Sequence, residues 1–142
     1  IQTNKTKLIA NHFSWVHSID RIKVAKRLNE HRSNQDTPLN ICLQVNISGE
    51  ITKSGVLPQE LPALLEAIET CENLCLRGLM AIPEKNASAA SFIQMQQLFL
   101  TLKTRYPTMD TLSMGMSADM QHAINAGSTL VRIGSAIFGA RN

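Results

Sequence analysis

Two stretches near the end of the chain decide the fold: TLSMGMSAD at residues 111–119 and STLVRIGSAIFGA at residues 128–140. Each is an apolar run that ends in small residues and then opens onto a helical pattern. A strand followed by a helix in this way can seat a phosphate on backbone N–H groups and a helix N-terminus. In a (β/α)8 barrel the recurrent phosphate site follows the seventh and eighth strands, so two such motifs in succession favour a barrel.

Strands and helices alternate along the whole chain. Patterns of apolar residues predict five strands, at residues 13–19, 39–47, 74–82, 111–116 and 130–134, and helices between them. This alternation is typical of parallel βα units in one domain spanning residues 1–142. A doubly wound sheet would carry its glycine-rich phosphate motif near the first strand, whereas here the motifs follow the last two.

The expected fold is therefore α/β, of the parallel (β/α)8 TIM-barrel type. A complete barrel needs about 250 residues. The 142 residues of this chain can hold only about the last five βα units, so the leading strands are expected to be absent from it.

The composition is that of an ordinary globular domain, with 44% hydrophobic and 18% charged residues. Fourteen Lys and Arg against eleven Asp and Glu, scattered over helix positions, give no stripe for nucleic acid. No apolar run approaches the roughly 20 residues that cross a membrane, and the first ten residues do not resemble a signal peptide. A cytoplasmic protein is expected.

The three cysteines form no CxxC motif, which predicts reduced thiols and no metal site.

Two features of the closing motifs point to a ligand. Ser117 stands at a helix N-cap position, where it can cap the helix or, together with Gly134 and Ser135 after the next strand, bind an anion. Asp119 counts against the anion because it repels a second negative charge. Arg132 lies inside an apolar strand, where a guanidinium needs a partner: either solvent or a carboxylate, or a ligand acceptor that must stay unprotonated.

A family resemblance appears at these residues. LSMGMSADM from Leu112 and VRIGSAIFGAR from Val131 resemble the pyridoxal phosphate homeostasis family, the YggS-type proteins formerly called proline-synthetase-associated. The likeness extends over essentially the whole chain, through IQTNK, WVHSID, QVNISGEITKSG and LRGLMAIP. It implies a barrel like the N-terminal domain of alanine racemase, with this chain as its C-terminal portion and pyridoxal 5′-phosphate (PLP) as its cofactor.

The resemblance also implies roles for individual residues. The Met116–Ser117 backbone and the Ser117 side chain, with Gly134 and Ser135, would hold the PLP phosphate, and Arg132 would face the pyridine nitrogen. A fixed cation there keeps the nitrogen unprotonated and weakens the ring as an electron sink. The family's Schiff-base lysine ends its first barrel strand, and none of the chain's seven lysines matches that position. No catalytic residue is therefore assigned.

Three functions follow as expectations. The first is a PLP-binding protein of intracellular PLP homeostasis, which carries or buffers the cofactor rather than acting as an enzyme. The alternative is a PLP-dependent amino-acid racemase, or another phosphate-binding TIM-barrel enzyme. The third is that this part of a barrel binds nothing alone and self-associates through open strand edges, while the intact protein is monomeric.

Overall fold

The computed structural model describes residues 3–48, 54–82, 89–116 and 120–132, without the side chains of Thr3, Met116 and Arg132. Five strands form one parallel sheet in which each strand pairs with its neighbour in sequence. The strands are β1 (Trp15–Ile19), β2 (Leu39–Val45), β3 (Leu74–Ala81), β4 (Thr111–Met116) and β5 (Leu130–Arg132). The order β1-β2-β3-β4-β5 confirms the predicted succession of βα units, because a doubly wound sheet reverses its strand order at one point.

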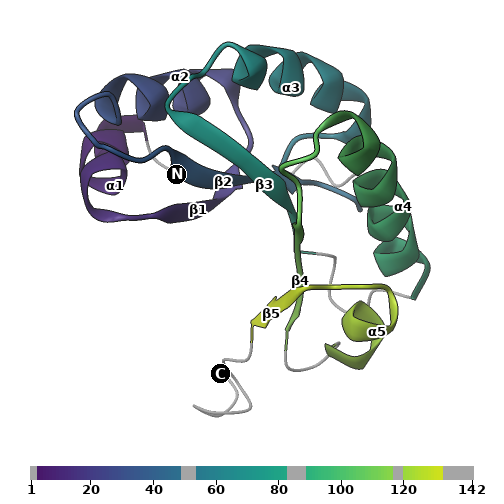
Figure 1. The fold of residues 1–142 in the computed structure, drawn as a ribbon. Coiled ribbons are helices and arrows are strands. Elements are labelled where there is room, and N and C mark those ends of the chain that lie inside the picture. Colours follow the sequence, from purple (N-terminus) through teal and green to yellow (C-terminus); the bar gives the residue numbers. More distant parts are fainter. Residues whose placement is uncertain (1–2, 49–53, 83–88, 117–119, 133–142) are drawn as a thin grey trace.

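The helices lie on one side of the sheet; α1 precedes β1, and each later helix connects two successive strands. They are α1 (Thr6–His12), preceded by the 3-10 turn η1 (Thr3–Lys5), α2 (Ile22–His31), α3 (Leu61–Glu69), preceded by η2 (Pro58–Glu60), α4 (Ala89–Arg105) and α5 (Met120–Asn125). Figure 1 shows them following one another around the outside of a sheet that curls from β1 to β5. Right-handed crossovers between successive parallel strands place every helix on the same face. The molecule is thus an arc of an α/β barrel, as the sequence predicted.

The hydrophobic core lies between the convex face of the sheet and this layer of helices. On β2, the alternate residues Leu39, Ile41 and Leu43 are fully buried in it. The helices contribute one apolar face each, as Phe92 and Met95 of α4 do. Alternation places Cys42, between Ile41 and Leu43, and Gln44, after Leu43, on the concave face of the sheet. Burial on both faces explains why the strands carry little polar alternation.

A bulge in β3 changes which residues face the interior. Ile41 pairs with Leu76, but the next residue of β2, Cys42, pairs with Gly78, so Arg77 is an extra residue in the ladder. Gly78 is required there, because a Cβ atom would collide with the backbone carbonyl of Thr111 in β4. The closeness of β3 and β4 therefore depends on one glycine.

From the sequence, Gly127 is predicted to close the helix that precedes it, and Asp20 is predicted to cap the helix that begins at residue 21. Only the first prediction is confirmed. Gly127 has φ +88° and closes α5, since its N–H bonds to Ile124 O (3.0 Å) and the Ser128 N–H bonds to Ala123 O (3.0 Å). The expectation that Asp20 caps α2 is wrong. The N-cap is Arg21, without a side-chain cap, and Asp20 accepts a hydrogen bond from a distant loop instead.

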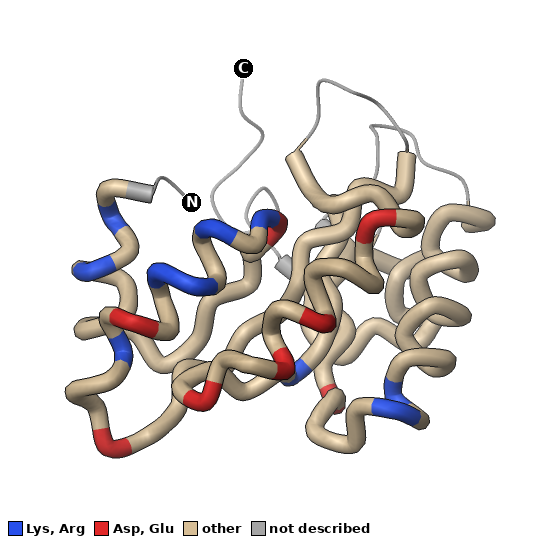
Figure 2. Tube along the Cα trace, turned by 90° about the horizontal axis from the view of Figure 1, so that it is seen from above, with Lys and Arg blue, Asp and Glu red and all other residues tan. Residues whose placement is uncertain are grey.

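Lys and Arg residues gather on the first two helices, and an acidic stretch follows near α3 (Figure 2). The exposed basic residues in or directly before α1 and α2 are Lys5, Lys7, Arg21, Lys23, Lys26 and Arg27. No helix in the described ranges is long and apolar enough to cross a membrane.

Candidate functional site

The carboxyl ends of the strands form the candidate site, because loops at this edge carry the ligands of parallel α/β folds. Met116 is the last residue of β4 and Arg132 the last of β5, and their Cα atoms are register partners. The structure thus brings the two closing motifs together at one edge. Ser117, Gly134 and Ser135, the other predicted site residues, lie outside the described residues, as does the predicted helix at 135–140.

Gly115 lets α5 approach the end of β4. Its φ of +101° is a left-handed value that favours glycine, and a Cβ atom there would lie 2.5 Å from the Cβ of Ala123 and 3.3 Å from Cγ1 of Val131. Any larger residue would have to push α5 or β5 away. The compact approach of α5 to these strands therefore depends on Gly115.

Hydrogen bonds fix the start of β5 against β4. The Thr129 N–H donates to Leu112 O (2.9 Å), and the Leu112 N–H donates to the Thr129 hydroxyl (2.7 Å). The Ser128 hydroxyl also lies 2.7 Å from Met114 O. These bonds hold β4 and β5 in the register that aligns their carboxyl ends.

The loop after β2 folds back onto the same end of the sheet. Val56 forms a parallel bridge with Val45, and its N–H donates to Gln44 O (2.8 Å). Gly55, at φ +117°, donates its N–H to Oδ2 of Asp20 (3.0 Å), at the end of β1. This contact explains why Asp20 does not cap α2: its carboxylate holds the returning loop. Lys53, in the same loop, lies outside the described residues.

Polar side chains meet across the concave face. Nδ1 of His17 on β1 lies 3.2 Å from Oγ of Ser113 on β4, and Ser113 is fully buried. The edge of the Trp15 ring packs on the His17 ring, with centroids 5.8 Å apart. His17 thus joins β1 to β4 through Ser113 and contacts Trp15 on its own strand.

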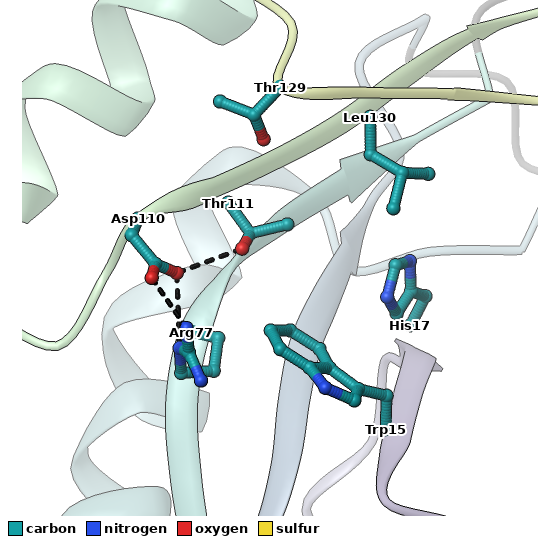
Figure 3. A pocket seen from close by; sticks show the side chains of 7 residues that line it. All are labelled: Trp15, His17, Arg77, Asp110, Thr111, Thr129 and Leu130. Atoms are coloured by element: carbon teal, nitrogen blue, oxygen red, sulfur yellow. Dashed lines mark hydrogen bonds and ion pairs between the residues drawn. The ribbon is translucent and has the colours of Figure 1, made fainter.

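A cavity of about 380 Å³ opens at the opposite, amino-terminal end of the strands (Figure 3). Arg77 and Asp110 form an ion pair on its wall, with Nε–Oδ1 at 3.0 Å and Nη2–Oδ2 at 2.5 Å. Arg77 also donates to Oδ1 of Asn40 (3.1 Å), and its guanidinium lies 4.6 Å from the Trp15 ring centroid. The charged groups here, Arg77 and Asp110, pair with each other, and ligand sites of this architecture lie at the other end of the strands, so we assign this pair a structural role.

Arg77 was not singled out from the sequence, although the signal was present. It is a cation inside an apolar strand, the same feature that drew attention to Arg132. For Arg77 the structure supplies the carboxylate partner that such a residue needs. The ion pair with Arg77 holds the pKa of Asp110 below its usual value.

The three cysteines lie in the described part of the chain. Cys42, Cys71 and Cys75 are free thiols, and burial raises the pKa of Cys42 to about 12. A thiol with that pKa is neutral at physiological pH and is a poor nucleophile. In the part of the chain that the structure describes, no three His, Cys, Asp or Glu residues come together as metal ligands.

Comparisons with known proteins agree with this architecture. The family model described as "Alanine racemase, N-terminal domain" matches residues 1–142. Pyridoxal phosphate homeostasis proteins of Pseudomonas aeruginosa and Vibrio cholerae are each 56% identical over 146 aligned residues, which cover all of this chain and 62% of the relative. The chain therefore spans under two thirds of the length of these relatives.

Solved structures show the same likeness. PipY of Synechococcus elongatus, determined with PLP bound, superposes with a TM-score of 0.86 at 32% identity, over 98% of this chain and 67% of PipY. The resemblance found in the sequence motifs is confirmed by these comparisons.

Proposed function

We propose that this chain, which belongs to the family of the alanine racemase N-terminal domain, is the C-terminal part of a single PLP-binding barrel that acts in PLP homeostasis. The observation that carries the proposal is the alignment of the β4 and β5 ends, where Met116 and Arg132 are register partners. The names of the 56% identical relatives and the PLP bound to PipY support it.

The described residues at this end of the sheet fit the cofactor. PLP carries a phosphate dianion and a ring with polar groups on three sides, so its site needs a close backbone approach for the phosphate and polar groups for the ring. Gly115 allows α5 to pack tightly against the strand that leads to the phosphate motif. On the concave face nearby, the side chain of Gln44 is 8% exposed and has no hydrogen-bond partner among the described residues.

We assign the residues as follows. The Met116–Ser117 backbone, the Ser117 hydroxyl, Gly134 and Ser135 hold the phosphate, and Arg132 lies beside the pyridine nitrogen. PLP, when bound, supplies an aldehyde that condenses with amines and a ring that withdraws electrons. Arg132 keeps its proton at any workable pH, so the ring nitrogen beside it stays unprotonated. That state weakens the electron withdrawal and suits a protein that holds PLP better than one that performs transamination.

A racemase is the second candidate, because the matching family model takes its name from alanine racemase. The two candidates differ in the fate of an amino-acid substrate. The whole protein, loaded with PLP, should leave the α-proton of L-alanine unexchanged in deuterated water, as followed by proton NMR. Exchange of that proton, with appearance of D-alanine, would favour the racemase over the carrier.

The phosphate seat is tested by equilibrium binding of PLP to the whole protein that contains these residues. Replacing both hydroxyls, Ser117→Ala with Ser135→Ala, should weaken PLP binding by about tenfold or more, because each removes a bond to a charged group. Inorganic phosphate should compete with PLP in the parent protein. Arg105→Gln is the matched control: Arg105 is exposed and pairs with Glu69 at 3.3 Å, away from the strand ends. Equal PLP affinity in the double variant and the parent would overturn the assignment.

A further inference from the structure

Gln44 carries a buried side-chain amide that has no hydrogen-bond partner among the described residues. It is the penultimate residue of β2 and lies on the concave face, since its neighbours Leu43 and Val45 are both in the core on the other face. Only 8% of Gln44 is exposed, and its side chain forms no hydrogen bond with any described residue. Native structures rarely leave such a group unpaired, because a buried amide without a partner loses the hydrogen bonds that it makes to water.

The other buried polar residues of the described chain show the contrast. Asn46 accepts a hydrogen bond from the Ser48 hydroxyl at 3.0 Å, and Ser113 lies against His17. Arg32 donates to three backbone carbonyls, those of Ala10, Phe13 and Thr37. Each of these groups is satisfied within the protein. Gln44 is the exception, and an exception of this kind points to a group that is not part of the protein.

The register places Gln44 beside the proposed cofactor site. Gln44 pairs with Met80 of β3, Met80 pairs with Ser113 of β4, and Ser113 pairs with Leu130 of β5. These residues form one row across the sheet, below the strand ends that carry Met116 and Arg132. In this row, Gln44 on β2 and Ser113 on β4 lie two strand spacings apart, about 10 Å. A ligand whose phosphate is held at the β4 and β5 ends can thus extend its ring toward Gln44.

The positions of the polar atoms around the PLP ring determine which of them can contact Gln44. The pyridine nitrogen and the 3-oxygen lie on opposite sides of the line from the phosphate-bearing ring carbon to the methyl-bearing carbon. If the nitrogen faces Arg132 on β5, the 3-oxygen faces the β2 side of the sheet. We propose that the side-chain amide of Gln44 donates a hydrogen bond to the 3-oxygen of bound PLP. This inference rests on the proposed function and adds a binding residue to it.

The test is a cycle of two ligands and two proteins. PLP and 3-deoxypyridoxal 5′-phosphate, which lacks only the 3-oxygen, are titrated into the whole protein and into its Gln44→Met variant, which keeps the length of the side chain. The parent should prefer PLP by about tenfold to a hundredfold more than the variant does. The ratio of PLP affinity to 3-deoxypyridoxal 5′-phosphate affinity is compared between the parent and the variant, which removes the intrinsic difference between the two ligands. Equal ratios in the two proteins would overturn the inference.

A stability measurement without ligand gives an independent check. Because the Gln44 amide has no partner among the residues that the structure describes, Gln44→Met should leave the melting temperature of the PLP-free protein unchanged or raise it. Asn46→Leu, at a buried amide that does have a partner, should lower it. Gln94→Met, at an exposed glutamine on α4, is the neutral control. A lower melting temperature for Gln44→Met would show that Gln44 has a structural partner, which also overturns the inference.

Competition by inorganic phosphate separates failure of this inference from failure of the proposed function. If the parent binds neither PLP nor phosphate, the proposed PLP site itself is wrong. If both bind, phosphate affinity is the same in the parent and the Gln44→Met variant, and the ligand ratios do not differ, then only the role of Gln44 is wrong.

Discussion

Arg77 and Asp110 bind each other through two contacts, Nε–Oδ1 at 3.0 Å and Nη2–Oδ2 at 2.5 Å, across the gap between β3 and β4. The pair exists because a bulge at Arg77 shifts the alternation of β3 and directs this side chain toward the concave face. Asn40 and Trp15 contact the same guanidinium. The Arg77 guanidinium thus links β3 to β1, to β2 and to the residue just before β4, at the amino-terminal end of the sheet.

This geometry predicts a pH-dependent contribution to stability. The pKa of Asp110 is lowered in the folded protein, first by the hydrogen bond from Arg77. A lowered carboxyl pKa stabilises the fold above the pKa of the unfolded chain, near 4, and the contribution is lost as pH falls through the folded value. Asp110→Asn should therefore lower the melting temperature at pH 7, while the difference from the parent shrinks toward pH 3. A difference that stays constant with pH would show that the charge is unimportant. Asp36→Asn, at an exposed loop position, is the control.

Gly78 should tolerate no larger residue. A Cβ atom there meets the Thr111 carbonyl, which is backbone in the neighbouring strand and cannot rotate away. Gly78→Ala should destabilise the protein by about 3 kcal/mol or more, at the upper end of overpacking effects. Gly127→Ala is the matched comparison: its Cβ would meet only a flexible Gln96 side chain, so the left-handed φ of +88° is the main cost, about 1 kcal/mol. Urea unfolding, followed by circular dichroism, measures the stability of both variants. Equal losses of stability in Gly78→Ala and Gly127→Ala would contradict a collision of the Gly78 Cβ with the Thr111 carbonyl.

The fold could be predicted from the sequence because strands and helices leave patterns of apolar residues within short stretches of the chain. Apolar runs and helical periodicity within about 15 residues located all five strands, and a glycine after a helix marked the end of α5 at Gly127. The position of the phosphate motifs at the end of the chain then distinguished a barrel from a doubly wound sheet.

The side-chain contacts could not be predicted in the same way, because they join distant residues. The Asp20 carboxylate does not cap the helix that follows it but accepts a hydrogen bond from Gly55, 35 residues away. His17 contacts Ser113, 96 residues away. That the Gln44 amide has no hydrogen-bond partner in the described part of the chain can be seen only when its spatial neighbours are known. For Arg132 the sequence raised the question of a partner, and the answer remains a prediction.

The thiols should react in an order set by burial. The pKa of Cys42 is raised to about 12, chiefly by desolvation, so its reactive thiolate is almost absent at pH 8. Cys75 is only partly buried. Iodoacetamide at pH 8 should therefore modify Cys75 long before Cys42 in the folded protein, and both at similar rates in urea, as followed by peptide mass spectrometry. Early modification of Cys42 would mean that the concave face opens readily to solvent.

The contact of Gly115 with Ala123 can be tested by pairing two substitutions. Gly115→Ala places a methyl group 2.5 Å from the Ala123 Cβ, so it should push α5 away from β4, reduce stability by about 2–3 kcal/mol and weaken PLP binding at the seat that we propose. Ala123→Gly alone should cost about 1 kcal/mol, because it adds a glycine to a helix. In the double variant the methyl groups no longer collide. The combined loss should then be at least 1 kcal/mol smaller than the sum of the single losses, with PLP affinity partly restored. Losses that add fully would show that the backbone angle of Gly115, rather than its contact with α5, determines the effect.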